Sequence, residues 1–355
     1  MGDLISGQYQ YSDLVNRYGN FQVPTYKIKA DGNEISGPAG AFVTSIEITL
    51  SLEYASCAVI HLAGAYDAKK RAFSSSLKKS FSLGAILEIE LGYLSAHTKI
   101  FKGYISSVLM NVSENPVFII TAMDVRKLMM DSRYKERYFN DTNYSDMVSK
   151  VMNDYKGLCS VECDSSNDKL NRNIYQKGSD YEFIVNVLGR RMNKEFFVLG
   201  DKAYFRTHDS LAAEVMTLEY GLGLLSFTKR SNYLDLSIVT VSYDKAETKS
   251  VKSEIPAKNK ELKSPVLSNP SKEVFVQCDL ETVEELKTAN SFIAEDKIRK
   301  ARIGSGRCIG LPEIVPGRYI KIKKTDSGMD GKYYITQVKH SLGENGFQTE
   351  FQTEG

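Results

Sequence analysis

Two segments of the chain follow the same pattern, and this internal repeat constrains the fold more than any other feature. In the first segment, Leu83-Gly84 leads into AILEIELGY, and a loop precedes FKGYISSVLMNV, the turn Glu114-Asn115-Pro116 and VFIIT. In the second, Pro316-Gly317 leads into RYIKIKK, and a loop precedes DGKYYITQVKHSL, the turn Glu344-Asn345-Gly346 and FQTEF. Both read as turn, strand, loop, long strand, tight turn, strand. We interpret the repeat as a duplication that gives two similar β-barrel-like modules.

The elements around the repeat predict the organisation of the whole chain. From Thr25 to Met123 the signals are those of antiparallel strands, with a turn at Asp31-Gly32. NYSDMVSKVMNDYKG then predicts a helix, and strands return with GLLSFTKRSNYLDLSIVTVSYD. The predicted fold is mainly β (α+β), with two similar antiparallel β-barrel-like modules and an inserted small α/β domain. We place the first module with its N-terminal segment at 1–127, the α/β domain at 128–212 and the second module at 213–355.

The stretch 178–206 is predicted to be a helix packed on a hairpin. Ser179 and Glu182 form a capping box, so the helix begins near Asp180. The two apolar runs of EFFVLGDKAYFR flank Gly200-Asp201, a pair that can take the positive φ angles of a tight turn. The apolar stripe of this helix consists of Tyr181, Ile184, Val187, Leu188 and Met192.

Two further segments of the second module have distinct composition. The segment 245–272 is rich in Lys and Pro and has no aromatic residue, which predicts a mobile loop or a strand extension that orders only against a partner. A helix over 281–302 follows, with Thr282 and Glu285 as a second capping box. The role of residues 1–21 stays open.

Charge and cysteine content bear on the compartment and the partners. Lys and Arg number 46 against 44 Asp and Glu, so a formal charge of +2 gives no electrostatic case for specific nucleic-acid binding. The five cysteines are odd in number and scattered, which suits a reducing compartment. The N-terminus lacks the features of a signal peptide, and no apolar run reaches the roughly 18 residues of a membrane anchor.

No motif for catalysis, cofactor binding or metal binding stands out, so we predict no such residues and a protein that is not an enzyme. His61, His97, His208 and His340 have no companions at metal-ligand spacing. Cys159 and Cys163 are predicted to point to the same side of a strand, as ordinary half-buried positions do. GSGRCIG at 304–310 has the glycines of a phosphate loop in the wrong order, and we read it as a helix stop and turn.

Five stretches in sequence resemble one family. They are LGAILEIELGY with FKGYI, ITAMDVRKLM, SDMVSKVMNDYKGL, GSDYEFIVNVLGRRMNKEFFV and the last strands from GLPEIVPGRYIKIKK onward. The chain looks like the phage late control gene D proteins, hubs of contractile tails that are similar to the first part of VgrG. The motif positions, for which the resemblance implies structural roles, are Gly84, Gly92, Phe101, Gly103, Asp124, Ser179, Asp180, Glu182, Gly310, Pro316, Gly317, Gly331, Tyr334 and His340.

The resemblance implies a homotrimer with approximate sixfold symmetry at the tip of a sixfold tail tube. Its expected partners are itself, the tube or tube-initiator proteins, other baseplate proteins and a spike protein. We expect the spike to be a separate protein, because in VgrG it follows in the same chain, whereas here few residues follow the last strand. The expected location is the bacterial cytoplasm and then the baseplate of a phage tail, tailocin or related injection particle. A tail-associated cell-wall hydrolase and a distal tail protein of a non-contractile phage remain the alternatives.

Overall fold

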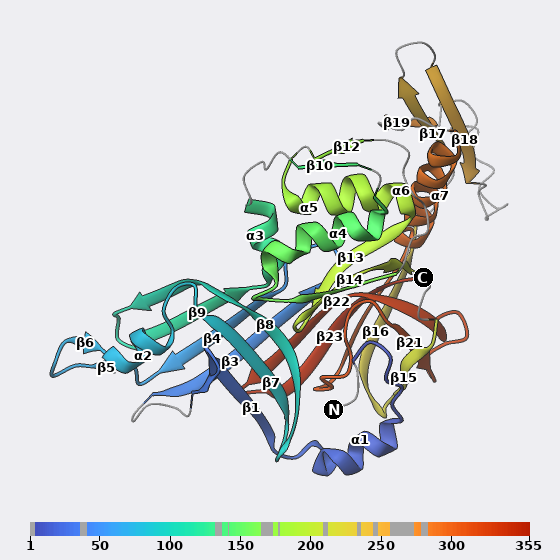
Figure 1. The fold of residues 1–355 in the computed structure, drawn as a ribbon. Helices are drawn as coiled ribbons and strands as arrows, with labels where there is room; N and C mark the ends of the chain where they lie inside the picture. The colour runs from blue at the N-terminus through green and yellow to red at the C-terminus, as the bar shows by residue number, and fades with distance from the viewer. Residues whose placement is uncertain are drawn as a thin grey trace.

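The computed structural model describes residues 4–35, 41–131, 137–140, 142–164, 173–176, 178–208, 212–232, 236–243, 248–255, 273–277 and 283–355. Within these residues a 13-stranded sheet runs through the body of the molecule, in the order β2-β1-β7-β8-β9-β4-β3-β22-β21-β15-β16-β20-β23 (Figure 1). The sheet contains two sets of strands that repeat one another. The mainly β fold with an inserted α/β part is therefore confirmed.

The first module consists of six strands and their connections. They are β1 (Pro24–Ala30), β3 (Phe42–Ser51), β4 (Cys57–Ala63), β7 (Ile86–Tyr93), β8 (Ala96–Asn111) and β9 (Val117–Met123). The second module consists of β15 (Glu214–Tyr220), β16 (Gly223–Ser231), β20 (Arg302–Ile309), β21 (Tyr319–Lys323), β22 (Gly331–Gly343) and β23 (Gly346–Glu354). In space the orders are β1-β7-β8-β9-β4-β3 and β15-β21-β22-β23-β20-β16, so strands of equal rank along the two chain segments occupy equal places.

The repeat extends to single hydrogen bonds. Gly84 and Gly317 have φ angles of 84° and 81°, and their N–H groups donate to the carbonyl oxygens of Ile105 and Ile335, at 2.9 Å in both modules. Ile105 and Ile335 donate back, to Ala85 at 2.9 Å and to the Arg318 carbonyl at 2.8 Å. The register of the following strand pair shifts directly after each of these isoleucines. The duplication inferred from the sequence is thus present in the backbone.

The modules differ in how they close. The second forms a ring, because β15 pairs with β16 and β22 pairs with β23. In that ring β15 lies parallel to β21, whereas the equivalent strands β1 and β7 of the first module are antiparallel. Strand β15 is therefore a local exception to the antiparallel pattern. The first module joins the second instead, through antiparallel pairing of β3 with β22 from Ile46 to Ser51. A single continuous core of buried residues underlies both modules.

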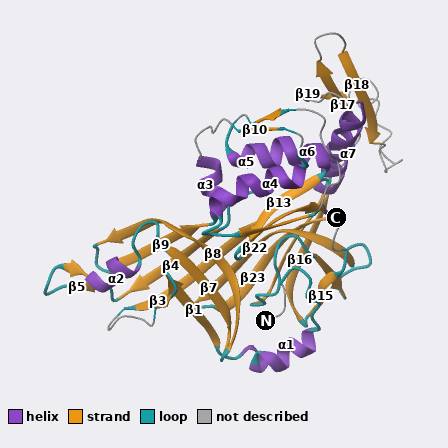
Figure 2. Ribbon diagram, in the orientation of Figure 1, coloured by secondary structure: helices purple, strands orange, loops and turns teal. Residues whose placement is uncertain are grey.

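The α/β part lies between β9 and β15 and has a core of its own. Its helices are α3 (Val125–Asp131), α4 (Tyr144–Met152), α5 (Asp180–Glu182) and α6 (Arg190–Met192), and its strands are β10 (Tyr138–Phe139), β11 (Ser160–Cys163), β12 (Ile174–Tyr175), β13 (Lys194–Leu199) and β14 (Lys202–Thr207). Figure 2 shows α3 to α6 gathered on one side of the large sheet, with α1 (Tyr11–Arg17) on the opposite side. The division at 1–127, 128–212 and 213–355 remains a prediction.

The predicted helix-and-hairpin unit is present, with one difference. Ser179 and Glu182 form the capping box, and Gly200 takes a φ of 59° between β13 and β14. The helix is not regular, however, because Phe183–Gly189 is π-helical between α5 and α6. Phe183, which lies outside the predicted stripe, is fully buried and its ring stacks on Phe139 at 5.5 Å.

The smaller elements are β2 (Asn33–Glu34), β5 (Tyr66–Asp67), β6 (Ala72–Phe73) and α2 (Ser75–Ser80) in the first module, with β17 (Leu236–Tyr243), β18 (Thr248–Ile255), β19 (Glu273–Gln277) and α7 (Val283–Lys300) in the second. The whole segment 245–272 is predicted to be a mobile loop or a strand extension that orders only against a partner. This is wrong for Thr248–Ile255, which pairs with β17 of its own chain. The rest of that segment and Thr282 of the second capping box lie outside the described residues.

The interpretation of 304–310 as a helix stop and turn is wrong. Helix α7 ends at Lys300, and Arg302–Ile309 is strand β20, paired with β16 and β23. The glycines make room for aromatic rings, because a Cβ at Gly306 would lie 2.2 Å from the ring of Phe351. At Gly304 it would lie 2.9 Å from the ring of Phe227.

Candidate functional site

The histidines do not form a reactive centre in the described structure. His340 is fully buried in β22, with its ring nitrogens 2.9 Å from the Thr349 hydroxyl and 3.1 Å from the Ile314 carbonyl oxygen. Burial lowers the pKa of His340 to about 3, so the ring is neutral near pH 7 and serves packing. Among the described residues, no group of three or more His, Cys, Asp or Glu side chains is arranged to hold a metal ion.

The cysteines of the α/β part are packed as apolar residues. Cys159 is buried and Cys163 is half-buried, and both are free thiols. Burial raises the pKa of Cys159 to about 12 and that of Cys163 to about 11. Because the thiolate is the nucleophile and the metal ligand, both groups are unreactive at neutral pH. Three groups of polar side chains lie where one part of the chain meets another.

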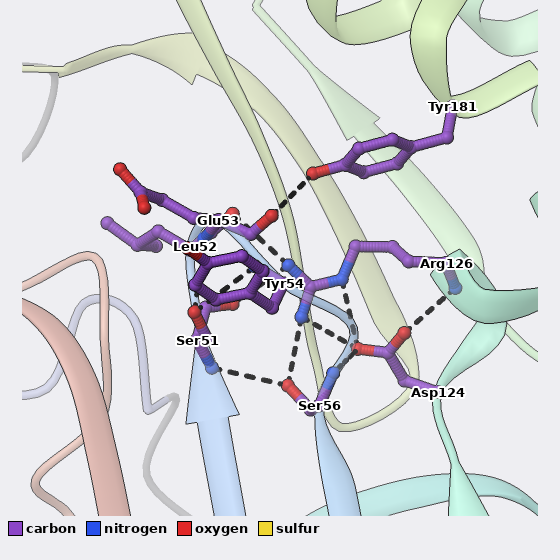
Figure 3. Close-up of polar contacts among 8 residues, drawn as sticks. All are labelled: Ser51, Leu52, Glu53, Tyr54, Ser56, Asp124, Arg126 and Tyr181. Atoms are coloured by element: carbon purple, nitrogen blue, oxygen red, sulfur yellow. Dashed lines mark hydrogen bonds and ion pairs between the residues drawn. The ribbon is translucent and has the colours of Figure 1, made fainter. Parts of the chain in front are cut away.

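The first of these junctions is built around Asp124 and Arg126, at the exit from β9 into α3 (Figure 3). Nη2 of Arg126 donates to Oδ2 of Asp124 at 2.7 Å, and Nε donates to the same oxygen at 3.0 Å. The backbone N–H of Ser56, in the β3–β4 turn, donates to that carboxylate at 2.7 Å. Nη1 of Arg126 donates to the carbonyl oxygens of Ser51 and Leu52 at 2.8 and 3.2 Å.

This junction joins three elements. Asp124 is 1% exposed and Arg126 is 0% exposed, so the ion pair is removed from water and each charge depends on the other. The remaining N–H donors of the guanidinium form hydrogen bonds with the β3–β4 turn. The Tyr181 hydroxyl of α5 donates to the carbonyl oxygen of Glu53 in the same turn at 2.8 Å (Figure 3). The turn, the start of α3 and α5 are therefore fixed to one another.

A second junction joins the α/β part to the second module. Tyr334 of β22 donates its hydroxyl to both carboxylate oxygens of Glu195 in β13, at 2.6 and 2.8 Å. Arg206 of β14 donates to the same carboxylate at 3.0 Å and also to the carbonyl oxygen of Gly317. Burial, together with the charge of Glu195, raises the pKa of Tyr334, so this phenol stays a hydrogen-bond donor.

A third junction joins the N-terminal segment to both modules. The Tyr18 hydroxyl, after α1, donates at 2.5 Å to Glu313, which is fully buried between β20 and β21. Nη1 of Arg17 lies 3.3 Å from the same carboxylate, and Nη2 donates to the Thr98 hydroxyl of β8 at 3.4 Å. Burial raises the pKa of Glu313. Arg318 fixes the start of the segment by donating to the carbonyl oxygens of residues 4 and 7.

The fourteen residues singled out from the sequence fall into two groups. Asp124, Gly317 and Tyr334 belong to the junctions, and Asp180 accepts hydrogen bonds from Arg137 and Tyr155, both at 2.6 Å, inside the α/β part. The others support the backbone or fill the core and do not meet at one place; they are Gly84, Gly92, Phe101, Gly103, Ser179, Glu182, Gly310, Pro316, Gly331 and His340.

Among the glycines of that group, two show why no side chain fits. A Cβ at Gly92 would lie 2.0 Å from the carbonyl oxygen of Ala96, and one at Gly103 would lie 2.2 Å from that of Met123. Sequence reasoning missed the partners Arg126, Glu195 and Glu313. The available signal was a charged residue beside apolar neighbours, as in AMDVR and LPEIV.

The fold has close counterparts among solved structures. The 43 kDa tail protein of prophage MuSo2 from Shewanella oneidensis superposes with a TM-score of 0.71 at 12% identity, covering 93% of this chain and 98% of that one. A tail protein from Neisseria meningitidis MC58 gives 0.69 at 11% identity, covering 94% and 96%. The E. coli c3393 protein, described as a component of the type VI secretion system, gives 0.58 at 13% identity, covering 92% and 76%.

These identities are low, so the likeness concerns the fold alone. The fold is shared with phage tail proteins and with a type VI secretion component. The chain itself belongs to the family described as the Alg8 N-terminal domain, whose model matches residues 20–344. No curated protein sequence matches it. In the described part of the chain, no helix has both the length and the apolar character needed to cross a membrane.

Proposed function

We propose that this chain is a structural, non-enzymatic hub of the baseplate of a contractile phage tail, a tailocin or a related injection particle. It acts as a homotrimer with approximate sixfold symmetry that joins the sixfold tail tube to a separate spike protein. The observation that carries the proposal is the duplicated six-strand order within one chain. The resemblance to late control gene D proteins and the folds of the tail proteins compared above support it.

The symmetry argument follows from the duplication. A tube of sixfold symmetry presents each of its contacts six times, whereas a homotrimer presents each of its own surfaces three times. Two modules with the same strand order in each chain give six similar modules from three copies. The duplication thus allows one protein to match both symmetries.

The sheet also offers a surface suited to lining a channel. Thr49, Lys339, Glu350, Arg307 and Ser226 lie directly opposite one another on β3, β22, β23, β20 and β16, and form one row across five strands. The row beside it has Gln337, Gln352, Ser305 and Thr228 in β22, β23, β20 and β16, and ends at Ser51 of β3, which is buried. Both rows border open grooves of 570 and 360 Å³. A polar sheet face that continues from one module to the next is the kind of wall that a water-filled tube requires.

The proposal is tested by light scattering and by electron microscopy of the full-length protein. The expected mass is three times the 39.8 kDa of the chain, alone or after mixing with the spike and tube proteins of the same particle. Class averages should show a ring of six similar lobes with threefold symmetry. A protein that stays monomeric with both partners present, or a ring whose two kinds of lobe occupy unrelated positions, would show that the proposal is wrong. Clear lysis of cell walls on a zymogram would instead favour the hydrolase alternative.

A further inference from the structure

One end of the first module carries a strongly basic appendage. It consists of β5, β6 and α2, which connect β4 to β7. The appendage exposes five cationic side chains against a single acidic one, Asp67, whereas the whole chain has a net charge of only +2. These exposed cations are Lys69, Lys70, Arg71, Lys78 and Lys79. The runs AKKR and LKK indicate this cluster in the sequence, although the net charge of the whole chain is close to zero.

The appendage is held in place by its apolar side chains. Phe73 of β6 is buried, and its ring lies 5.1 Å from that of Tyr66 and 6.0 Å from that of Phe118 in β9. Leu77 of α2 and Phe81 are 1% and 2% exposed. The cations therefore project from a packed element, so little backbone conformational entropy is lost when they bind a partner.

An exposed apolar patch adjoins the appendage. Met110 in β8 is 48% exposed and lies directly opposite Phe118, the residue against which Phe73 packs. Leu109 and Val112 at the same hairpin tip are 50% and 60% exposed. Figure 1 shows β5, β6 and α2 at the end of the module that β9 also reaches. Large apolar side chains with a charged rim are the usual composition of a protein–protein interface.

The corresponding end of the second module lacks this surface. Its hairpin between β22 and β23 turns at Glu344-Asn345, and Phe347 beside the turn is buried in the core. Leu342, on the other strand of that hairpin, is half-buried against the same core. The duplicated modules therefore differ in the surface that they expose at this end.

We propose that the β5–β6–α2 appendage and the β8–β9 hairpin tip together form a docking surface for an acidic protein. The apolar centre is Met110 and Val112, which lie two positions apart, and the basic rim is the five cations of the appendage. Leu109 directly precedes Met110 in β8, so its side chain lies on the opposite face of the strand. Single-stranded nucleic acid is less suited, because it needs exposed aromatic rings for stacking and Phe73 and Phe81 are buried. A membrane surface is less suited because Leu77, the large apolar residue of α2, faces the core rather than the solvent.

The test uses the full-length protein and, as probes, each purified protein encoded by the genes adjacent to its own. Binding is measured by biolayer interferometry for the wild type, for Lys69→Glu with Lys70→Glu, and for Lys78→Glu with Lys79→Glu. The matched control is Lys150→Glu with Lys156→Glu, an equal charge change on exposed lysines of the α/β part. One acidic probe is expected to bind, to lose about tenfold or more in affinity with each appendage pair, and to bind the control normally.

A second variant separates the apolar centre from charge alone. Met110→Ser with Val112→Ser is expected to weaken binding of the same probe at unchanged net charge, and rising salt is expected to weaken binding by the wild type. The proposal is overturned if no adjacent gene product binds, or if the control pair is as damaging as the appendage pairs. It is also overturned if a short DNA duplex or vesicles of anionic lipid bind through the same lysines and no protein does. The proposal is also overturned if the wild type self-associates and the appendage pairs abolish this self-association. The occupant of the surface would then be a second copy of the chain and not an acidic protein.

Discussion

At the scale of single residues, the charged side chains buried at the junctions do most to fix neighbouring elements relative to one another. Arg126 is completely buried, yet its five N–H donors have acceptors on Asp124, on Ser56 and on the β3–β4 turn. A buried ion pair of this kind adds little net stability over well-packed apolar residues, because both charges lose their hydration. We infer that its effect is on specificity, since the groups are satisfied by contacts to both the turn and the start of α3.

Replacing Arg126 by Met tests this interpretation. The variant leaves the Asp124 carboxylate buried without its counter-ion, and we expect the free energy of unfolding to fall by about 3–5 kcal/mol. The neighbouring Lys127 forms an exposed pair with Asp131 at 2.6 Å, so Lys127→Met should leave the free energy of unfolding almost unchanged. Urea denaturation followed by circular dichroism measures both. Equal losses in the two variants would show that the Arg126 network does not hold the junction.

His340 predicts a defined dependence of stability on pH. Its pKa is about 3 in the folded protein and near 6.5 when unfolded, so the unfolded chain binds more protons between these values. Stability therefore rises with pH across this window and is lost as the pH falls from 6.5 towards 3. His340→Gln removes this term, and we expect the wild type to lose about 2 kcal/mol more than the variant between pH 6.5 and pH 5. Denaturation curves that shift in parallel would contradict the assignment.

At the scale of elements, local signals in the sequence were sufficient for turns, caps and the repeat. The capping box at Ser179 and the turns at Asp31-Gly32 and Gly200 are set by residues close in sequence, and the structure has them as predicted. The duplication could be predicted from the sequence because each module has a glycine, Gly84 or Gly317, at the same backbone position. Packing between residues far apart in the sequence could not be predicted. Gly304 and Gly306 look like turn residues, but the rings of Phe227 and Phe351 require them inside a strand.

The buried junctions could not be predicted for the same reason. Asp124 was singled out as a motif residue, but its acceptor role depends on Ser56, which is distant in sequence and close only once β4 and β9 pair. Glu313 appeared as one charge in an apolar run, and its partner Tyr18 lies at the other end of the chain. Periodicity and capping reflect residues that are close in sequence. Contacts between residues this far apart along the chain therefore produce no local sequence pattern.

Gly103 offers a test of close backbone approach between two strands. A Cβ at this position in β8 would lie 2.2 Å from the carbonyl oxygen of Met123 in β9, where neither backbone can move freely. We expect Gly103→Ala to destabilise the protein by about 1–3 kcal/mol. Gly157→Ala is the control, because a Cβ there meets nothing within 4 Å. Thermal denaturation of both variants measures the difference, and equal behaviour would show that β8 and β9 tolerate a wider spacing.

At the scale of the whole molecule, the N-terminal segment and the β3–β22 pairing make one body of the two modules. The rings of Phe21, Tyr18, Tyr93 and Phe347 follow one another with centroid distances of 5.3 to 6.0 Å. Tyr93 belongs to the first module and Phe347 to the second, so the segment completes an aromatic cluster across the boundary. Residues whose role the sequence left open therefore contact both of the duplicated halves.

Tyr18 is the residue through which this coupling can be measured. Because its ring lies in the shared cluster and its hydroxyl reaches Glu313, Tyr18→Ala should lower the free energy of unfolding by about 3–5 kcal/mol. Tyr18→Phe keeps the ring and removes only the hydrogen bond to a buried carboxylate, so it should cost about 1–3 kcal/mol. By calorimetry we expect one transition in the wild type and in Tyr18→Phe, and a broadened or divided transition in Tyr18→Ala as the modules begin to unfold separately. If Tyr18→Ala unfolds as sharply as the wild type, the pairing of β3 with β22 alone couples the modules, and the N-terminal segment only covers their ends.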